Sequence, residues 1–103
     1  MSGRASNSLA DLGHGYGLAG KRAEALAIAR ELEERYVKRK ALGYDIAEVY
    51  MSLGEKEQAL AWLEKDFQTR SGYLPGIAWD IYFDPLRSDS RFASLLRRMG
   101  LRP

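Results

Sequence analysis

Few side chains in this chain have the types and spacing that catalysis or metal binding requires. The sequence contains a single histidine, His14, and no cysteine. Asp11 lies three residues before His14, which would put both on one helix face, but two ligands are too few for a metal site. Asp45 and Glu48 have a spacing that suits a carboxylate pair, although charged helix faces often show it. We therefore expect a protein that is not an enzyme and that binds neither a metal nor a cofactor. We expect His14 to be solvated or hydrogen-bonded.

A glycine-rich stretch, GHGYG, covers residues 13–17. A nucleotide-binding loop of glycines requires a β-strand before it. Here the stretch follows Leu12 inside a helical pattern, so the nucleotide interpretation does not apply. Gly13 and Gly17 are four residues apart and share one helix face. We expect them to allow close packing of another helix or to leave a groove open.

The composition is that of one ordinary globular domain. The chain has 103 residues, of which 46% are hydrophobic and 29% are charged, and its net charge of +2 is too balanced to indicate nucleic-acid binding. No apolar run approaches the roughly 18 residues of a membrane span. The polar residues 1–5, which we expect to be disordered, lack the apolar core of a secretion signal. We expect a cytoplasmic protein with no membrane partner.

A twelve-residue pattern occurs twice in the chain. The stretch YGLAGKRAEALA at residues 16–27 returns as YMSLGEKEQALA at residues 50–61, an offset of 34 residues. Each copy predicts a helical hairpin. Apolar residues recur at spacings of three and four before and after Gly20 and Gly54, and each glycine suits the left-handed conformation that ends a helix. Ser6, Asn7 or Ser8 is expected to cap the first helix.

The conserved order of residue types in the two copies resembles the tetratricopeptide repeat, whose period is also 34 residues. The first copy matches this pattern at Leu12, Gly13, Tyr16, Gly20 and Ala25, and the second at Ile46, Ala47, Tyr50, Gly54 and Ala59. The resemblance implies an all-α fold, a short right-handed α-solenoid of antiparallel hairpins. We expect one domain over residues 6–103, with repeats at 6–39 and 40–73.

Residues 74–103 are expected to leave the repeat and to form a capping hairpin. Asp84 and Ser88 stand where the next tyrosine and glycine would fall. Asp84-Pro85 predicts a turn or helix boundary, and Ser88, Asp89 or Ser90 predicts the N-cap of a last helix. Its apolar face would comprise Phe92, Leu95, Leu96 and Met99. This segment resembles the C-terminal ends of many bacterial tetratricopeptide proteins, in which such repeats often accompany signalling domains.

The resemblance implies that the first helix of each hairpin lines a concave groove that binds a peptide or protein. The residues expected there are His14, Tyr44, Asp45, Glu48, Met51, Trp79 and Tyr82. Tyr44 and Met51 are large and lie off the apolar stripe, as peptide anchors do, although Tyr44 could instead pack on a neighbouring helix. Trp79 and Tyr82 could extend the groove or pack inside the cap. Asp45 and Glu48 would make the groove acidic, which favours a basic or mixed peptide.

Two further functions stay open. The hairpin edge at Leu9 and Leu12 has no capping helix before it, so the chain could form a homo-oligomer. More remotely, the basic residues near the C-terminus could bind nucleic acid, although a solvated helix face is the ordinary interpretation. These basic residues are Arg87, Arg91, Arg97, Arg98 and Arg102.

Overall fold

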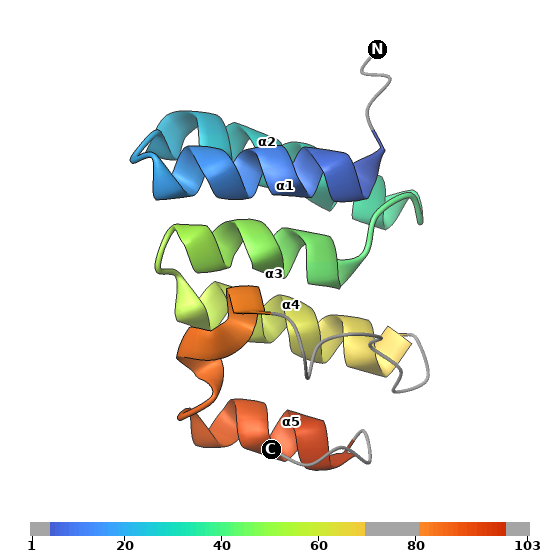
Figure 1. Ribbon diagram of the computed structural model, residues 1–103. Helices are drawn as coiled ribbons and strands as arrows, with labels where there is room; N and C mark the ends of the chain where they lie inside the picture. Colours follow the sequence, from blue (N-terminus) through green and yellow to red (C-terminus); the bar gives the residue numbers. More distant parts are fainter. Residues whose placement is uncertain (1–4, 70–80, 99–103) are drawn as a thin grey trace.

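The fold is all-α over the part of the chain that the structure describes. The computed structural model describes residues 5–69 and 81–98 and shows no β-strand there (Figure 1). The α-helices are α1 (Ser6–Leu18), α2 (Arg22–Val37), α3 (Gly43–Ser52), α4 (Lys56–Thr69) and α5 (Ser90–Arg98), and one 3-10 helix, η1, spans Ile81–Leu86. The all-α prediction is confirmed. The predicted disorder of residues 1–5 falls, apart from Ala5, outside the described residues.

Two hairpins form successive layers. α2 folds back along α1, α4 folds back along α3, and α3 lies beneath α1 (Figure 1). Gly20 and Gly54 end the first helix of each hairpin with φ angles of +79° and +75°. A Cβ atom at either position would meet nothing within 4 Å, so backbone conformation rather than crowding favours glycine there. The predicted turns are therefore confirmed.

The same backbone hydrogen bond closes both of these turns. Lys21 N donates to Tyr16 O at 2.8 Å, and Glu55 N donates to Tyr50 O at 3.0 Å. A bond of this span satisfies a helix carbonyl that has no partner within the helix. The two copies thus share geometry as well as residue types.

The 34-residue interval extends into the third segment. The helices before the turns end at Leu18, Ser52 and Leu86, and the helices after them begin at Arg22, Lys56 and Ser90. Each position lies 34 residues after the one before it. Residues 74–103 were expected to leave the repeat, and their residue types differ from it, but the helix boundaries described here keep its 34-residue interval.

Asp84-Pro85 lies inside η1 rather than at a boundary, which corrects the predicted turn. Proline lacks an N–H group, but a short 3-10 segment loses a single hydrogen bond to it. The Asp84 carbonyl still accepts a hydrogen bond from Arg87 N at 3.0 Å, which continues the chain toward α5.

The helix caps agree with the prediction at α5 and differ at α1. Asp89 precedes α5, and its Oδ1 accepts a hydrogen bond from Arg91 N at 2.8 Å, as an N-cap side chain does. In contrast, Ala5 occupies the N-cap of α1 and makes no side-chain cap bond. The Ser6 hydroxyl instead donates to the Lys40 carbonyl at 2.6 Å, so it joins the start of α1 to the segment before α3.

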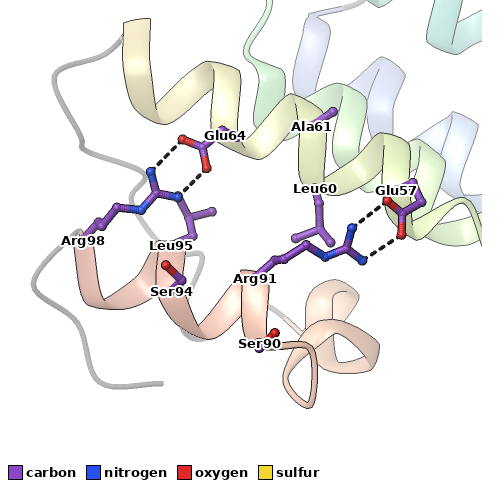
Figure 2. A pocket seen from close by; sticks show the side chains of 9 residues that line it. All are labelled: Glu57, Leu60, Ala61, Glu64, Ser90, Arg91, Ser94, Leu95 and Arg98. Atoms are coloured by element: carbon purple, nitrogen blue, oxygen red, sulfur yellow. Dashed lines mark hydrogen bonds and ion pairs between the residues drawn. The ribbon is translucent and has the colours of Figure 1, made fainter.

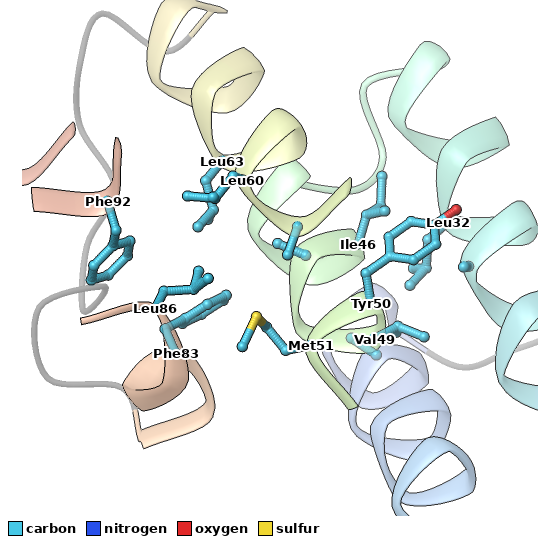
Figure 3. Close-up of a cluster of buried hydrophobic side chains, with 14 of the residues drawn as sticks. Leu32, Ile46, Val49, Tyr50, Met51, Leu60, Leu63, Phe83, Leu86 and Phe92 are labelled. Carbon is cyan, nitrogen blue, oxygen red and sulfur yellow. The ribbon is translucent and has the colours of Figure 1, made fainter. Parts of the chain in front are cut away.

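Helix α3 is the centre of the core. From Gly43 to Met51 every residue is buried except Tyr44, which is half-buried. α1 and α2 pack on one side of α3, and α4 and η1 pack on another (Figures 1 and 3). Phe83 and Leu86 of η1 are fully buried, and so are Phe92, Leu95 and Leu96 of α5. The predicted face of α5 is confirmed for these three residues, and Met99 lies outside the described residues.

Candidate binding surface

His14 connects the two hairpins and does not face an open groove. Its side chain is buried, and its Nδ1 atom lies 2.9 Å from the backbone oxygen of Glu48, 34 residues later. Because a carbonyl oxygen only accepts hydrogen bonds, this contact requires the proton on Nδ1. The expected exposure of His14 is therefore wrong, whereas the expectation of a hydrogen-bonded histidine is confirmed.

Met51 and Tyr44 contact the 3-10 helix. Met51 is 8% exposed and lies in the core beside Phe83 (Figure 3). The Tyr44 ring is 5.2 Å from the Phe83 ring, centroid to centroid, with an interplanar angle of 65°. The expected exposure of Met51 is wrong because η1 covers this part of α3. Tyr44 packs on a neighbouring element, which was the second possibility that the sequence left open.

The two acidic groove residues are also buried. Asp45 and Glu48 are 6% and 5% exposed. Asp45 Oδ2 accepts a hydrogen bond from Leu42 N at 3.1 Å and so caps the first turn of α3. Burial raises the pKa of Asp45, the Leu42 hydrogen bond opposes this rise, and Asp66 and Asp11 add to it. These carboxylates therefore do not give the surface an acidic groove, which corrects the expected charge.

Two predicted groove residues cannot be placed. Trp79 lies outside the described residues, and so does the side chain of Tyr82. Leu9 and Leu12 form the hairpin edge that was expected to allow self-association. Leu9 is only 5% exposed, and Leu12 is half-buried. The edge is thus less open than the sequence suggests, because Leu9 packs into the core.

A large hollow opens at the junction of α2, α3 and α4. Its volume is about 950 Å³. It is lined by Ser6, Tyr36, Val37, Arg39, Lys40, Ala41, Leu42, Asp45, Trp62, Lys65 and Asp66. We call it the junction hollow. Three separate stretches of chain contribute to it: Ser6 at the start of α1, residues 36–45 from the end of α2 to the first turn of α3, and Trp62, Lys65 and Asp66 of α4.

Aromatic side chains make one wall of the junction hollow. The Tyr36 and Trp62 rings meet edge to face, with centroids 5.1 Å apart and an interplanar angle of 75°. Lys65 Nζ lies 4.7 Å from the centre of the Trp62 ring, within range of a cation–π contact. Val37 stands on the rim with 82% of its surface exposed. An exposed apolar side chain beside an aromatic wall and charged groups is the arrangement of a peptide-anchoring surface.

A residue in the left-handed conformation, Arg39, follows the end of α2 on the rim of the junction hollow. Arg39 has a φ angle of +61°, and Lys40 N donates to Arg35 O at 2.7 Å. This bond has the same span as those at the Gly20 and Gly54 turns. Because Arg39 carries a Cβ atom, the left-handed conformation strains it where glycine would not be strained.

A second hollow, of about 510 Å³, lies between α4 and α5 (Figure 2). Two arginine–glutamate pairs connect the helices across it. Arg91 donates to both oxygens of Glu57, at 2.6 and 2.7 Å, and Arg98 donates to both oxygens of Glu64. The hydrogen bonds lower the pKa of both glutamates. Leu60 and Leu95 lie between the pairs, and we call this arrangement the α4–α5 clamp.

The α4–α5 clamp weakens the hypothesis that the basic residues of α5 bind nucleic acid. Arg91 and Arg98 are paired with glutamates, and Arg87 Nε contacts Asp84 Oδ1 at 2.7 Å. Phosphate binding would have to displace these carboxylates. The described part of α5 therefore presents fewer available cations than its sequence suggests.

The sequence interpretation did not single out Val37, Arg39 or Trp62 as functional. One signal was present, because Val37 is an apolar residue that directly precedes the basic stretch Lys38–Lys40. Its position off the apolar face of α2 could have marked it as exposed.

Among the described residues, no group of three or more His, Cys, Asp or Glu side chains is arranged to hold a metal ion. None of the helices described is both long enough and apolar enough to cross a membrane. Comparison of the chain with protein-family models, curated protein sequences and solved structures finds no significant match.

Proposed function

We propose that this chain is a tetratricopeptide-like module that binds a peptide segment of a partner protein. The 34-residue interval of three successive pairs of helix boundaries supports the repeat assignment. By the same resemblance, we assign the module to a regulatory or signalling protein of the bacterial cytoplasm. Its role is to bind, without catalysis or a cofactor.

The observation that carries the binding proposal is the junction hollow. Its volume of about 950 Å³ is large enough for several side chains. Val37 and the Tyr36–Trp62 wall offer apolar contact area beside charged groups. This site replaces the groove expected from the sequence, because His14, Asp45, Glu48 and Met51 contribute to the core.

Photo-crosslinking from the rim tests the proposal. Val37 and Leu18 are both exposed aliphatic residues, with exposed fractions of 82% and 71%, at opposite ends of the first hairpin. A photoreactive amino acid at position 37 is expected to form a discrete adduct with one partner polypeptide in an extract of the source cell. The same group at position 18 is the matched control and is expected to form none.

The variant Val37→Asp supplies the second arm of this experiment. It places a charge on the rim, so binding of the partner identified by crosslinking should weaken at least tenfold. The melting temperature should change by no more than about 4 °C, because substitutions at exposed positions change stability by about 0.5 kcal/mol or less. Equal crosslinking from positions 18 and 37 would contradict the proposal. Adducts between two copies of this chain would instead support self-association.

A further inference from the structure

We propose that the junction hollow selects an acidic peptide segment that carries one apolar anchor side chain. This inference rests on the proposed function and specifies the chemistry of the partner. It reverses the charge expected from the sequence, which favoured a basic or mixed peptide.

The first support is the distribution of charge around the junction hollow. Arg39, Lys40 and Lys65 line it and are exposed to solvent. The two carboxylates that also line it, Asp45 and Asp66, are 6% and 1% exposed. The mouth of the hollow is therefore cationic, and an acidic segment complements it.

The buried carboxylates are turned toward the protein. Asp45 Oδ2 accepts from Leu42 N at 3.1 Å, and Asp66 Oδ2 accepts from Tyr44 N at 3.4 Å. Both contacts compensate the positive end of the α3 dipole. The two carboxylates thus stabilise the start of α3, whereas Arg39, Lys40 and Lys65 lie at the surface.

The second support is the conformation of Arg39. Left-handed glycines, Gly20 and Gly54, follow the first helices of the two hairpins, whereas a left-handed arginine follows α2. The sequence has a cation at a position where glycine would relieve strain. Strained residues cluster at functional sites, so this outlier indicates that the Arg39 side chain has a role on the rim.

The third support favours a peptide over a nucleic acid. Single-stranded nucleic acids bind by stacking bases on open aromatic faces. In this hollow the Tyr36 ring meets Trp62 edge to face, and Lys65 Nζ lies over the Trp62 ring. These contacts restrict stacking on Trp62, while the exposed Val37 still offers apolar contact to an aliphatic or aromatic anchor.

Panning of the full chain against a random dodecapeptide phage library tests the inference. Retained peptides are expected to combine at least two Asp or Glu residues with one large apolar residue. The double variant Arg39→Glu/Lys40→Glu should bind the leading synthetic peptide at least tenfold more weakly, as measured by fluorescence polarisation. The control Lys21→Glu/Arg97→Glu makes the same charge change at exposed positions outside the hollow and should stay within twofold.

A second variant separates binding from folding. Arg39→Gly removes the strain and the cation together, so its melting temperature should rise while its affinity for the acidic peptide falls. A folding defect would instead lower both. Replacing the acidic residues of the peptide by lysine should abolish its binding to the unmodified chain.

The outcomes distinguish the inference from the proposed function. If no peptide is retained, the proposed function itself fails. If peptides are retained but are basic, or bind Arg39→Glu/Lys40→Glu unchanged, the inference fails and peptide binding stands. A fluorescent oligothymidine that binds more tightly than the best peptide, and that loses affinity in Arg39→Glu/Lys40→Glu, would overturn the inference in favour of nucleic acid.

Discussion

Gly15 and Gly17 lie two positions apart in α1 and have opposite surroundings. A Cβ atom at Gly15 would meet nothing within 4 Å. A Cβ atom at Gly17 would lie 1.9 Å from Ser52 Oγ, 2.7 Å from Ser52 Cβ and 3.1 Å from the Ser52 backbone carbon. The hydroxyl could rotate away, but the Cβ and the backbone of α3 could not. Gly17 therefore allows α1 to approach α3 closely.

The same substitution at these two positions should change stability in opposite directions. Gly15→Ala replaces a helix-interior glycine in open space and should stabilise the protein by about 0.5–1 kcal/mol. Gly17→Ala forces α1 away from α3 and should destabilise the protein by about 1–3 kcal/mol. Urea denaturation of the two variants measures both effects.

Relief of the clash provides the control for this pair. Ser52→Gly removes the two side-chain atoms that a Cβ at Gly17 would meet. Combined with Gly17→Ala, it should therefore cost less than the sum of the two single changes. Strict additivity, or equal effects of alanine at positions 15 and 17, would contradict the close contact between α1 and α3.

At the scale of helices, the sequence predicted the first two hairpins because local signals mark them. Gly20 and Gly54 have the required positive φ angles, and helical spacing identified the buried faces of α2 and α4. The third unit lacks these signals, since Asp84 and Ser88 replace tyrosine and glycine. Its helices keep the 34-residue interval because packing on α3 and α4 positions them.

The binding surface was less predictable than the helices. Whether Met51 is exposed depends on Phe83, which reaches α3 from another part of the chain. Likewise, the junction hollow joins Val37 to Trp62, 25 positions apart, and only the tertiary fold brings them together. Helical periodicity identifies a face of one helix but does not say which neighbour covers it.

The α4–α5 clamp predicts that docking of α5 depends on pH. Arg91 and Arg98 hold the pKa of Glu57 and of Glu64 below the ordinary value of 4.5. A carboxylate with a lowered pKa in the folded state contributes stability above its ordinary pKa and loses it as pH falls through the lowered value. Amide-exchange protection of α5, relative to α3, should therefore decline below about pH 4.5.

Neutral substitutions at the two glutamates isolate this effect. Glu57→Gln/Glu64→Gln should reduce α5 protection at pH 6 and remove most of its decline below pH 4.5. Asp89 will keep a weaker pH dependence in that variant, because its hydrogen bonds with Arg91 lower its pKa to about 2. Glu24→Gln, at an exposed position on α2, is the control. An unchanged decline in the double variant would show that another group causes it.

For the molecule as a whole, the third unit completes the core rather than only covering it. η1 and α5 contribute five side chains that are at most 1% exposed: Phe83, Leu86, Phe92, Leu95 and Leu96. Burial of each such side chain contributes about 1.5–3 kcal/mol. Together they contribute about 7.5–15 kcal/mol, which is comparable to the roughly 5–15 kcal/mol by which a typical domain is stable. The two hairpins alone should therefore not form a stable fold.

Truncation after Thr69 tests this dependence of the hairpins on the third unit. Residues 1–69 should retain helical circular dichroism but melt without a cooperative transition, and should bind a dye specific for exposed apolar surface, because Met51, Leu60 and Leu63 lose their cover. The full chain with Leu95→Ala should keep a cooperative melt, destabilised by about 2–5 kcal/mol, since one cavity leaves the remaining contacts in place. A cooperative, dye-free melt of residues 1–69 would instead mean that α1 to α4 form an independent domain, and the burial of α3 would then have to come from the two hairpins alone.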